Sequence, residues 1–211
     1  MYTPPAFRED DLKKIHTLMN DYSFATLVTQ QNGVLIASHL PVMVDTRQGQ
    51  YGTLASHMAR ANTQWQGFDG TQEALVIFQG PHTYVSPSWY VDNVEVSVPT
   101  WNYTVVHAYG KPSLITEQED LYNLLQALVQ KHEAMFDHQW KFQPSDEFMR
   151  SKMKGFVGFE MEITRLEGKG KLSQNRSSSD QKRVISALEE HSDTLGINAT
   201  EIAKLMHEHS K

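Results

Sequence analysis

Alternating hydrophobic and polar positions recur along the first 166 residues and predict a domain built mainly from antiparallel strands. Asn32-Gly33 is the strongest turn signal, because a type I′ hairpin needs two residues that accept positive φ. Strands joined by such turns, with few helices between them, indicate an antiparallel barrel or sandwich with flanking helices. The expected strands cover residues 23–30, 34–44, 51–56, 73–79, 82–87, 98–109 and 156–166.

Helical spacing of apolar residues predicts shorter segments around these strands. Thr116 and Glu119 form a capping-box pattern ahead of a leucine-rich helix. Phe148 is expected to face inward from a second helix, residues 144–153. Further helices are expected at residues 10–20, 180–191 and 200–209.

Two sequence breaks suggest how the chain is divided. Gly80-Pro81 is expected to end the apolar strand 73–79. After Leu166 the sequence becomes polar and carries Gly and Ser, which is typical of a linker. We therefore expect a main domain of residues 1–176 and a small C-terminal helical appendage of residues 177–211.

Composition narrows the function classes. The chain has 211 residues, a hydrophobic fraction of 39% and a formal net charge of −6, which does not favour non-specific binding of polyanions. The absence of cysteine excludes disulfides, thiolate catalysis and cysteine-bound metals. No apolar stretch resembles a signal core or a membrane span, so a cytoplasmic protein without a membrane partner is expected.

Residues 53–65, TLASHMARANTQW, concentrate hydrogen-bond donors between a strand and an aromatic side chain. Arg60 offers a charged fork that suits phosphate, and Trp65 adds a flat apolar face. This segment, called the donor loop below, suits a phosphorylated ring-bearing cofactor. A polar surface turn followed by a buried Trp explains the same pattern.

Three further segments have two interpretations each. Residues 80–90 and 99–109 are rich in Trp and Tyr, which either fill a core or wall a planar ligand. Residues 171–176, KLSQNR, form either a solvated linker or a second set of donors for a phosphate or a ring edge.

Catalytic and metal motifs are not evident. His132 and His138 lack the i,i+4 spacing of a helical metal pair, and His107 is more typical of a packed strand histidine. The sequence has no Walker loop, G-x-G-x-x-G fingerprint or nucleophile elbow. We therefore assign no catalytic residue and no metal ligand.

Six motifs, in order, resemble the PaiB family: MYTPPAFRE, SHLP, TLASHMARANTQW, FQGPHTYVSPSWY, PTWNYTVVHAYGKP and KLSQNR. The resemblance covers roughly residues 1–180. Its members are described as FMN-binding negative transcriptional regulators of protease synthesis and sporulation. Thr63 stands where the family pattern would have Pro.

The resemblance implies an FMN-binding split β-barrel similar to pyridoxamine-phosphate oxidase and flavin reductase domains. It also implies a homodimer with FMN at the subunit interface. The expected phosphate-side residues are Ser56, His57, Arg60 and Asn62, with backbone contacts from Leu40 and Met58. The expected ring wall is Trp101 and Tyr103, and the expected contacts from the C-terminal side are Lys171, Ser173, Gln174, Asn175 and Arg176.

Three functions remain open: a flavin-binding negative regulator of transcription, an FMN-dependent oxidoreductase or flavin reductase with an indirect regulatory effect, and an FMN carrier. The flavin itself carries redox chemistry, so the missing catalytic motif does not separate them. The two C-terminal helices have the length of a helix-turn-helix unit. The final helix places Glu201 and Glu208 against Lys204, so DNA is a weakly supported partner.

Overall fold

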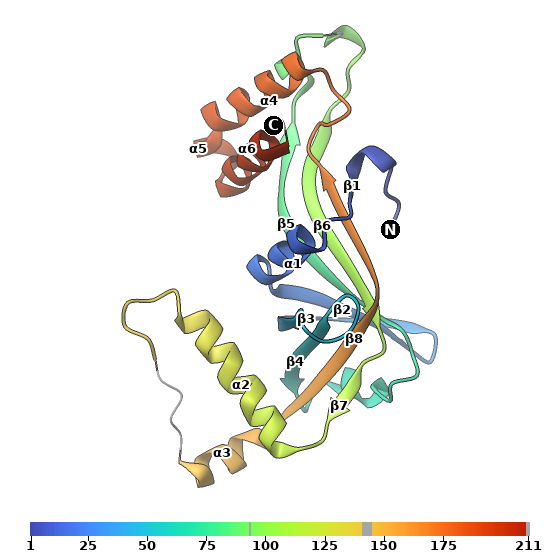
Figure 1. Cartoon of the computed structure of the whole chain (residues 1–211), viewed down its shortest axis with the longest axis vertical. Helices are drawn as coiled ribbons and strands as arrows, with labels where there is room; N and C mark the ends of the chain where they lie inside the picture. Colours follow the sequence, from blue (N-terminus) through green and yellow to red (C-terminus); the bar gives the residue numbers. More distant parts are fainter. Residues whose placement is uncertain (93, 141–144, 210–211) are drawn as a thin grey trace. The chain divides into compact units, whose positions relative to one another are not determined.

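The computed structural model describes residues 1–92, 94–140 and 145–209, which are mainly β with flanking helices (Figure 1). The strands are β1 (Arg8–Glu9), β2 (Phe24–Gln31), β3 (Val34–Asp45), β4 (Thr53–Ala59), β5 (Ala74–Val85), β6 (Thr100–Gly110), β7 (Ser113–Ile115) and β8 (Phe156–Lys171). The α-helices are α1 (Leu12–Asp21), α2 (Gln118–Glu133), α3 (Asp146–Met153), α4 (Ser178–Glu190), α5 (Ser192–Leu195) and α6 (Ile197–His209). Short 3-10 helices cover Pro5–Phe7, Thr63–Gly67, Pro87–Trp89 and Val94–Val96.

The strands form one eight-stranded sheet in the order β1-β8-β4-β3-β2-β5-β6, and β7 pairs with β8. A further pairing joins β6 to β8, so the strand path returns on itself and the sheet is ring-like. The recorded registers of β1–β8, β2–β3, β2–β5, β3–β4, β4–β8 and β7–β8 are all antiparallel. The predicted antiparallel, mainly β fold is confirmed.

Contacts within the chain divide it into two compact units, which are described separately below. The terminal unit comprises Met1–Leu18, Gln79–Val106 and Glu167–Lys211, and the central unit comprises Met19–Phe78 and His107–Leu166. Residues 177–211 therefore belong to the same unit as the segment 167–176.

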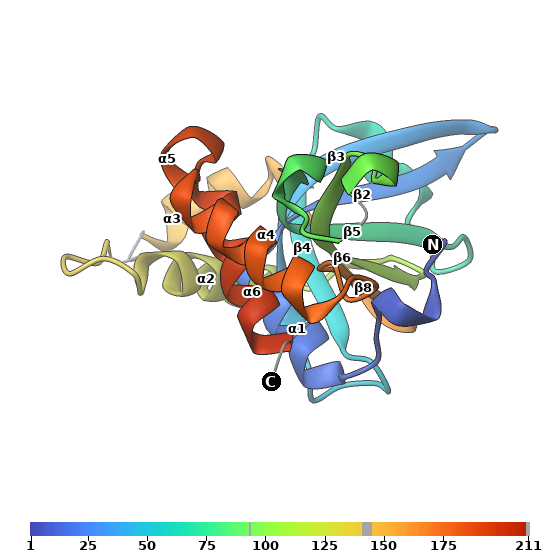
Figure 2. The ribbon, with the colours of Figure 1, turned by 90° about the horizontal axis from the view of Figure 1, so that it is seen from above.

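The central unit contains the predicted hairpin. Asn32 and Gly33 have φ of 51° and 81°, and β2 and β3 pair from Gln31↔Val34 to Phe24↔Pro41 (Figure 2). Helix α2 lies close to β8 at Gly158, where a Cβ would come within 2.8 Å of a Leu121 methyl group. The predicted leucine face of α2 is therefore buried against the sheet, with Leu121, Leu124 and Leu128 inside.

The terminal unit contains a second apolar cluster, formed where α4 and α6 pack side by side (Figure 1). Ser177 caps α4 by accepting a hydrogen bond from the backbone N–H of Asp180. The buried side chains of the cluster include Val85, Leu172, Val184, Leu188, Ile202 and Met206. The C-terminal helices thus complete a core.

Two predicted breaks are wrong. β5 continues through Gly80-Pro81 to Val85, and β8 continues past Leu166 to Lys171. The glycines in these stretches permit close approach: a Cβ on Gly80 would lie 2.2 Å from Thr104 Oγ1, and one on Gly168 would lie 2.8 Å from the Glu9 carbonyl oxygen. These glycines allow neighbouring strands to pack closely, and they do not mark loops.

The predicted helix details are also partly wrong. Glu117 is the N-cap of α2 without a side-chain cap, so the capping box of Thr116 and Glu119 does not form. Phe148 on α3 is 54% exposed and does not face inward. The expected start of this helix at Pro144 lies outside the described residues. No helix in the described parts of the chain is both long and apolar enough to cross a membrane.

Candidate functional site

Three predicted phosphate-side and backbone residues lie on β4 of the central unit, because this strand extends to Ala59. Ser56 and Met58 face the core and are buried, as is Leu40 on β3. The Ser56 hydroxyl donates a 2.7 Å hydrogen bond to the carbonyl of Pro41. This hydroxyl is therefore engaged across the β3–β4 pair.

His57 points to the opposite face of β4 from Ser56 and Met58 and is half-buried. Its ring lies edge-on to Phe156, with centroids 5.4 Å apart. Burial lowers the pKa of His57. Its Nδ1 is a buried atom with no hydrogen-bond partner within the described residues. His57 therefore favours the neutral form.

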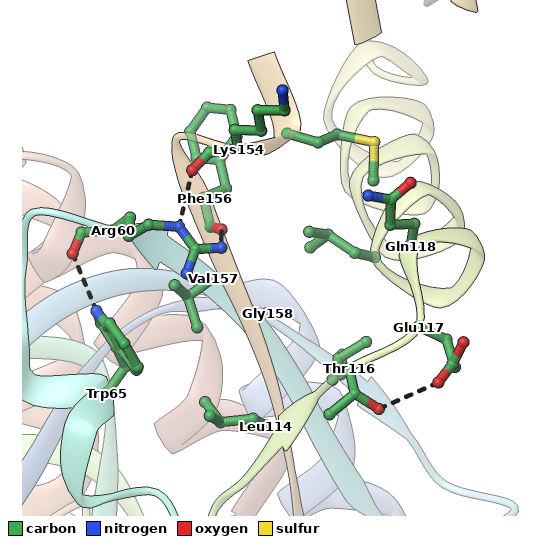
Figure 3. A pocket seen from close by; sticks show the side chains of 13 residues that line it. Arg60, Trp65, Leu114, Thr116, Glu117, Gln118, Lys154, Phe156, Val157 and Gly158 are labelled. Atoms are coloured by element: carbon green, nitrogen blue, oxygen red, sulfur yellow. Dashed lines mark hydrogen bonds between the residues drawn. The ribbon is translucent and has the colours of Figure 1, made fainter. Parts of the chain in front are cut away.

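Arg60 joins the donor loop to the start of β8 (Figure 3). Its Nε donates to the carbonyl of Lys154 at 2.7 Å, and its Nη2 donates to the carbonyl of Phe156 at 2.9 Å. Trp65 returns a 3.0 Å hydrogen bond from its indole N–H to the Arg60 carbonyl. Two of the five guanidinium N–H bonds thus hold the loop in place.

Asn62 belongs to a buried polar network centred on Gln64. The Asn62 amide donates to Ser38 Oγ at 2.8 Å, and Ser38 Oγ donates to Gln64 Oε1 at 2.5 Å. Gln64 Nε2 in turn donates to Thr29 Oγ1 at 2.9 Å and to the Ile36 carbonyl at 3.2 Å. The network attaches the short helix Thr63–Gly67, in which the donor loop ends, to the β2–β3 hairpin.

A largely apolar cavity of about 320 Å³ lies beside Arg60 in the central unit (Figure 3). The guanidinium and Lys154 are on one side, and the first residues of α2 are on the other. Its remaining lining includes Trp65, Leu114, Ile115, Leu121, Met153, Phe156 and Val157.

The predicted ring-wall residues lie on β6 of the terminal unit. Trp101 is 52% exposed, and its ring centroid lies 6.2 Å from those of both His82 and Tyr84. Tyr103 is half-buried. Part of the aromatic set therefore lies on the surface of this unit.

The KLSQNR segment is the end of β8 and the turn that follows it. Ser173 is buried at φ 63° and hydrogen-bonds with Asn102, and Gln174 bridges the Leu172 N–H and the Gly170 carbonyl. Asn175 is exposed and lines a polar cavity of about 430 Å³ with Arg176 and Asp180. The neutral side chains of Ser173 and Gln174 are thus committed to the turn itself.

Positive charge gathers at this end of β8. Lys171 donates to the hydroxyl of Thr100, and Lys169, which sequence reasoning left out of the site, lies 5.1 Å from the centroid of Tyr103. Burial, followed by the positive charges of Lys169 and Arg176, lowers the pKa of Lys171. The K-x-K spacing could have revealed Lys169, because it places both lysines on one face of a strand.

The thirteen predicted residues thus fall into two groups. Six lie in the central unit: Leu40, Ser56, His57, Met58, Arg60 and Asn62. Seven lie in the terminal unit: Trp101, Tyr103, Lys171, Ser173, Gln174, Asn175 and Arg176. Within the described residues, no group of three or more His, Asp or Glu is placed to hold a metal ion.

Comparison with known proteins places this chain among flavin-binding proteins. The family model described as "Putative FMN-binding domain" matches residues 1–165. The "Protease synthase and sporulation protein PAI 2" of Bacillus subtilis (strain 168) is 36% identical over 212 residues, covering 100% of this chain and 99% of that protein.

Two solved structures share the fold. The FAD and heme binding protein from Mycobacterium smegmatis has a TM-score of 0.61 at 12% identity, covering 83% of this chain and 78% of that one. The flavocytochrome Anf3 from Azotobacter vinelandii has a TM-score of 0.58 at 12% identity, covering 78% and 69%. The fold is thus that of a class of flavin-binding proteins, as the resemblance implied.

The chain belongs to the FMN-binding domain family that includes the PAI 2 protein, and FMN is its cofactor. The donor chemistry fits this cofactor. Arg60 retains N–H capacity for an anion beyond its two carbonyl acceptors, and the terminal unit offers cations beside an exposed indole.

Proposed function

We propose that the chain is an FMN-binding negative transcriptional regulator of the PaiB type that acts in the cytoplasm on genes of protease synthesis and sporulation. The observation that carries the proposal is the 36% identity to the PAI 2 protein over the whole of both chains. Because this similarity extends through residues 177–211, it includes the C-terminal helices as well as the cofactor domain.

Within each unit, the predicted residues are proposed as candidate contacts to FMN. Bound FMN supplies redox chemistry. Arg60 and its neighbours on the donor loop provide donors for the phosphate, and Trp101 and Tyr103 provide flat surfaces for the ring. Lys171 and Arg176 supply positive charge from the C-terminal side. Leu40 and Met58 are proposed to contribute through their backbone.

The functional form is proposed to be a homodimer. In the terminal unit, three valines at positions 94, 96 and 98 are exposed. Exposed apolar side chains of this kind are typical of surfaces that another chain covers. Sedimentation equilibrium at micromolar concentration should give twice the mass of one chain, and a single-chain mass would contradict the proposal.

Regulation is proposed to depend on the flavin state or on a partner, with little direct reading of DNA. The apolar face of α6 is occupied by the core of the terminal unit, through Ala199, Ile202 and Met206. Lys204 and Glu208 are exposed and have opposite charges, so α6 offers few contacts to phosphates.

Fluorescence anisotropy with candidate promoter DNA tests this regulatory role. At physiological salt, the full chain should bind with micromolar, unselective affinity, and Lys204→Ala should change that affinity little. Nanomolar, sequence-selective binding that Lys204→Ala weakens would instead identify α6 as a DNA-reading helix. The point variant is preferable to truncation, since α4 and α6 form part of a core.

A second function, FMN-dependent oxidoreductase or flavin reductase, is favoured by the exposed indole of Trp101. A flavin held beside an open aromatic surface can be reached by a second redox ligand. Steady-state NAD(P)H oxidation with FMN present tests it: rapid turnover would support the enzyme, and stoichiometric or no oxidation would favour the regulator.

A further inference from the structure

The terminal unit has one surface on which aromatic rings and cations lie together, called here the aromatic–cationic face. Its rings are those of His82, Tyr84, Trp101 and Tyr103, and its cations are Lys169, Lys171 and Arg176. Trp101 contacts the rings on either side and leaves half of its own surface open. The face therefore offers a flat apolar area bordered by positive charge.

The three cations of this face donate hydrogen bonds to neutral oxygens. Lys169 donates to the Tyr2 carbonyl at 3.1 Å, Lys171 donates to the Thr100 hydroxyl, and Arg176 donates to the Ser97 hydroxyl at 3.3 Å. Across residues 1–92, 94–140 and 145–209, none of the three forms an ion pair with a carboxylate.

Like charges held together and partly buried repel one another, and a bound anion relieves that repulsion. Burial is the main cause of the lowered pKa of Lys171, and the positive charges of Lys169 and Arg176 add to it. Lys169 is buried, so water screens its charge poorly. The face is thus suited to stabilise negative charge.

The neighbouring groups favour a planar anion over a phosphate. Phosphate sites commonly combine cations with neutral side-chain and backbone donors. Here Ser173 is bonded to Asn102, and Gln174 is bonded within its own turn. Besides their oxygen acceptors, two of the cations lie against rings, with Lys169 near Tyr103 and Arg176 4.0 Å from the centroid of Tyr90.

We propose that the aromatic–cationic face holds the isoalloxazine ring of FMN and binds the reduced cofactor more tightly than the oxidised one. This inference rests on FMN binding as proposed above. Two electrons and one proton from an external reductant convert the neutral oxidised ring into a ring with one negative charge. Lys171, Lys169 and Arg176 stabilise that charge, since positive charge near the ring tunes flavin electronics.

A consequence is that the redox state of the cell would set how firmly the cofactor is held. FMN would be retained under reducing conditions and released more readily under oxidising ones. The fraction of protein with bound FMN would then report the redox state, with no chemical change of the apoprotein. The size of this response is set by the difference in affinity between reduced and oxidised FMN.

Dithionite titration of the full chain with bound FMN, in the presence of a reference dye, tests the proposal. Lys171→Gln should weaken binding of reduced FMN about tenfold more than binding of oxidised FMN, which lowers the two-electron midpoint potential by about 30 mV. Lys171→Arg, which keeps the positive charge, should keep most of the wild-type preference for reduced FMN. Lys182→Gln on the exposed side of α4 is the matched control and should leave the potential unchanged.

An unchanged potential in a folded Lys171→Gln variant would overturn the proposal. So would a loss of affinity for oxidised FMN that riboflavin does not share, because Lys171 would then bind the phosphate. If the wild-type chain binds neither FMN nor riboflavin, the proposed function itself fails, and that outcome is visible before any variant is made. Circular dichroism and thermal unfolding of each variant establish that it is folded.

Discussion

The donor loop of the central unit and the aromatic–cationic face of the terminal unit both have sequences rich in polar side chains. In the donor loop, Ser56, Asn62 and Gln64 are hydrogen-bonded to other parts of the protein. On the aromatic–cationic face, Lys169 and Lys171 keep positive charges that no carboxylate of the described residues balances. The difference teaches that hydrogen-bonding side chains can serve to hold a loop in place, whereas positive charges without carboxylate partners favour the binding of an anionic ligand.

The largest expected effect concerns Gln64, the centre of the donor-loop network. Gln64→Ala removes a fully buried side chain and takes away the acceptor of the Ser38 hydroxyl and a donor to the Thr29 hydroxyl, so the free energy of unfolding should fall by about 2–4 kcal/mol. Urea unfolding measures the change, with exposed Gln66→Ala as the control. Equal stability of the two variants would show that the network does not hold the loop.

Arg60 tests whether the donor loop also binds the cofactor. Arg60→Ala should weaken FMN binding by about 1.5–3 kcal/mol, because one charge-assisted bond to the phosphate is lost. Flavin fluorescence titration measures it, and riboflavin affinity should not change. Arg47→Ala, an exposed arginine of the same unit, is the control. A variant that loses stability while keeping its FMN affinity would limit Arg60 to a structural role.

The smallest effect is a pH dependence in the central unit. Burial lowers the pKa of His57 below the unfolded value near 6.5, so the neutral ring stabilises the fold above that pH. As the pH falls through this value, the unfolded state takes up the proton more readily and stability is lost. Thermal unfolding from pH 7.5 to 5 should show this loss, and His57→Gln should reduce it. Exposed His138→Gln is the control, and a parallel pH profile for both variants would contradict this role.

Local chemistry made some features predictable. Asn32-Gly33 needs only its own backbone preferences to form the hairpin, and the apolar spacing of α2 places Leu121, Leu124 and Leu128 inside. Gly80 and Gly168 gave wrong predictions of strand ends. Each lacks a side chain because a strand distant in the sequence packs closely against it. A glycine that ends a strand and one that permits close approach look the same in sequence.

For the candidate site, the sequence indicates residue types but not the contacts that they make in the fold. Residue type and motif predict cofactor contacts for Trp101 and Lys171, and these contacts stay predictions. The partners of Ser56 and Asn62 depend on strand pairing that the sequence does not reveal. Lys169 was missed because residues 167–179 read as a linker, so the two-residue period of a strand was not applied to them. β8 extends to Lys171, and this extension brings Lys169 beside Tyr103.

The central claim is that the terminal unit binds the flavin ring and that its cations face the part of the ring that gains charge. A crystal structure of the full chain with FMN tests this most directly. The account predicts the ring against Trp101 and Tyr103, with Lys171 Nζ within about 3.2 Å of a ring nitrogen or oxygen. A phosphate held between Lys171 and Arg176, with the ring away from Trp101, would contradict it.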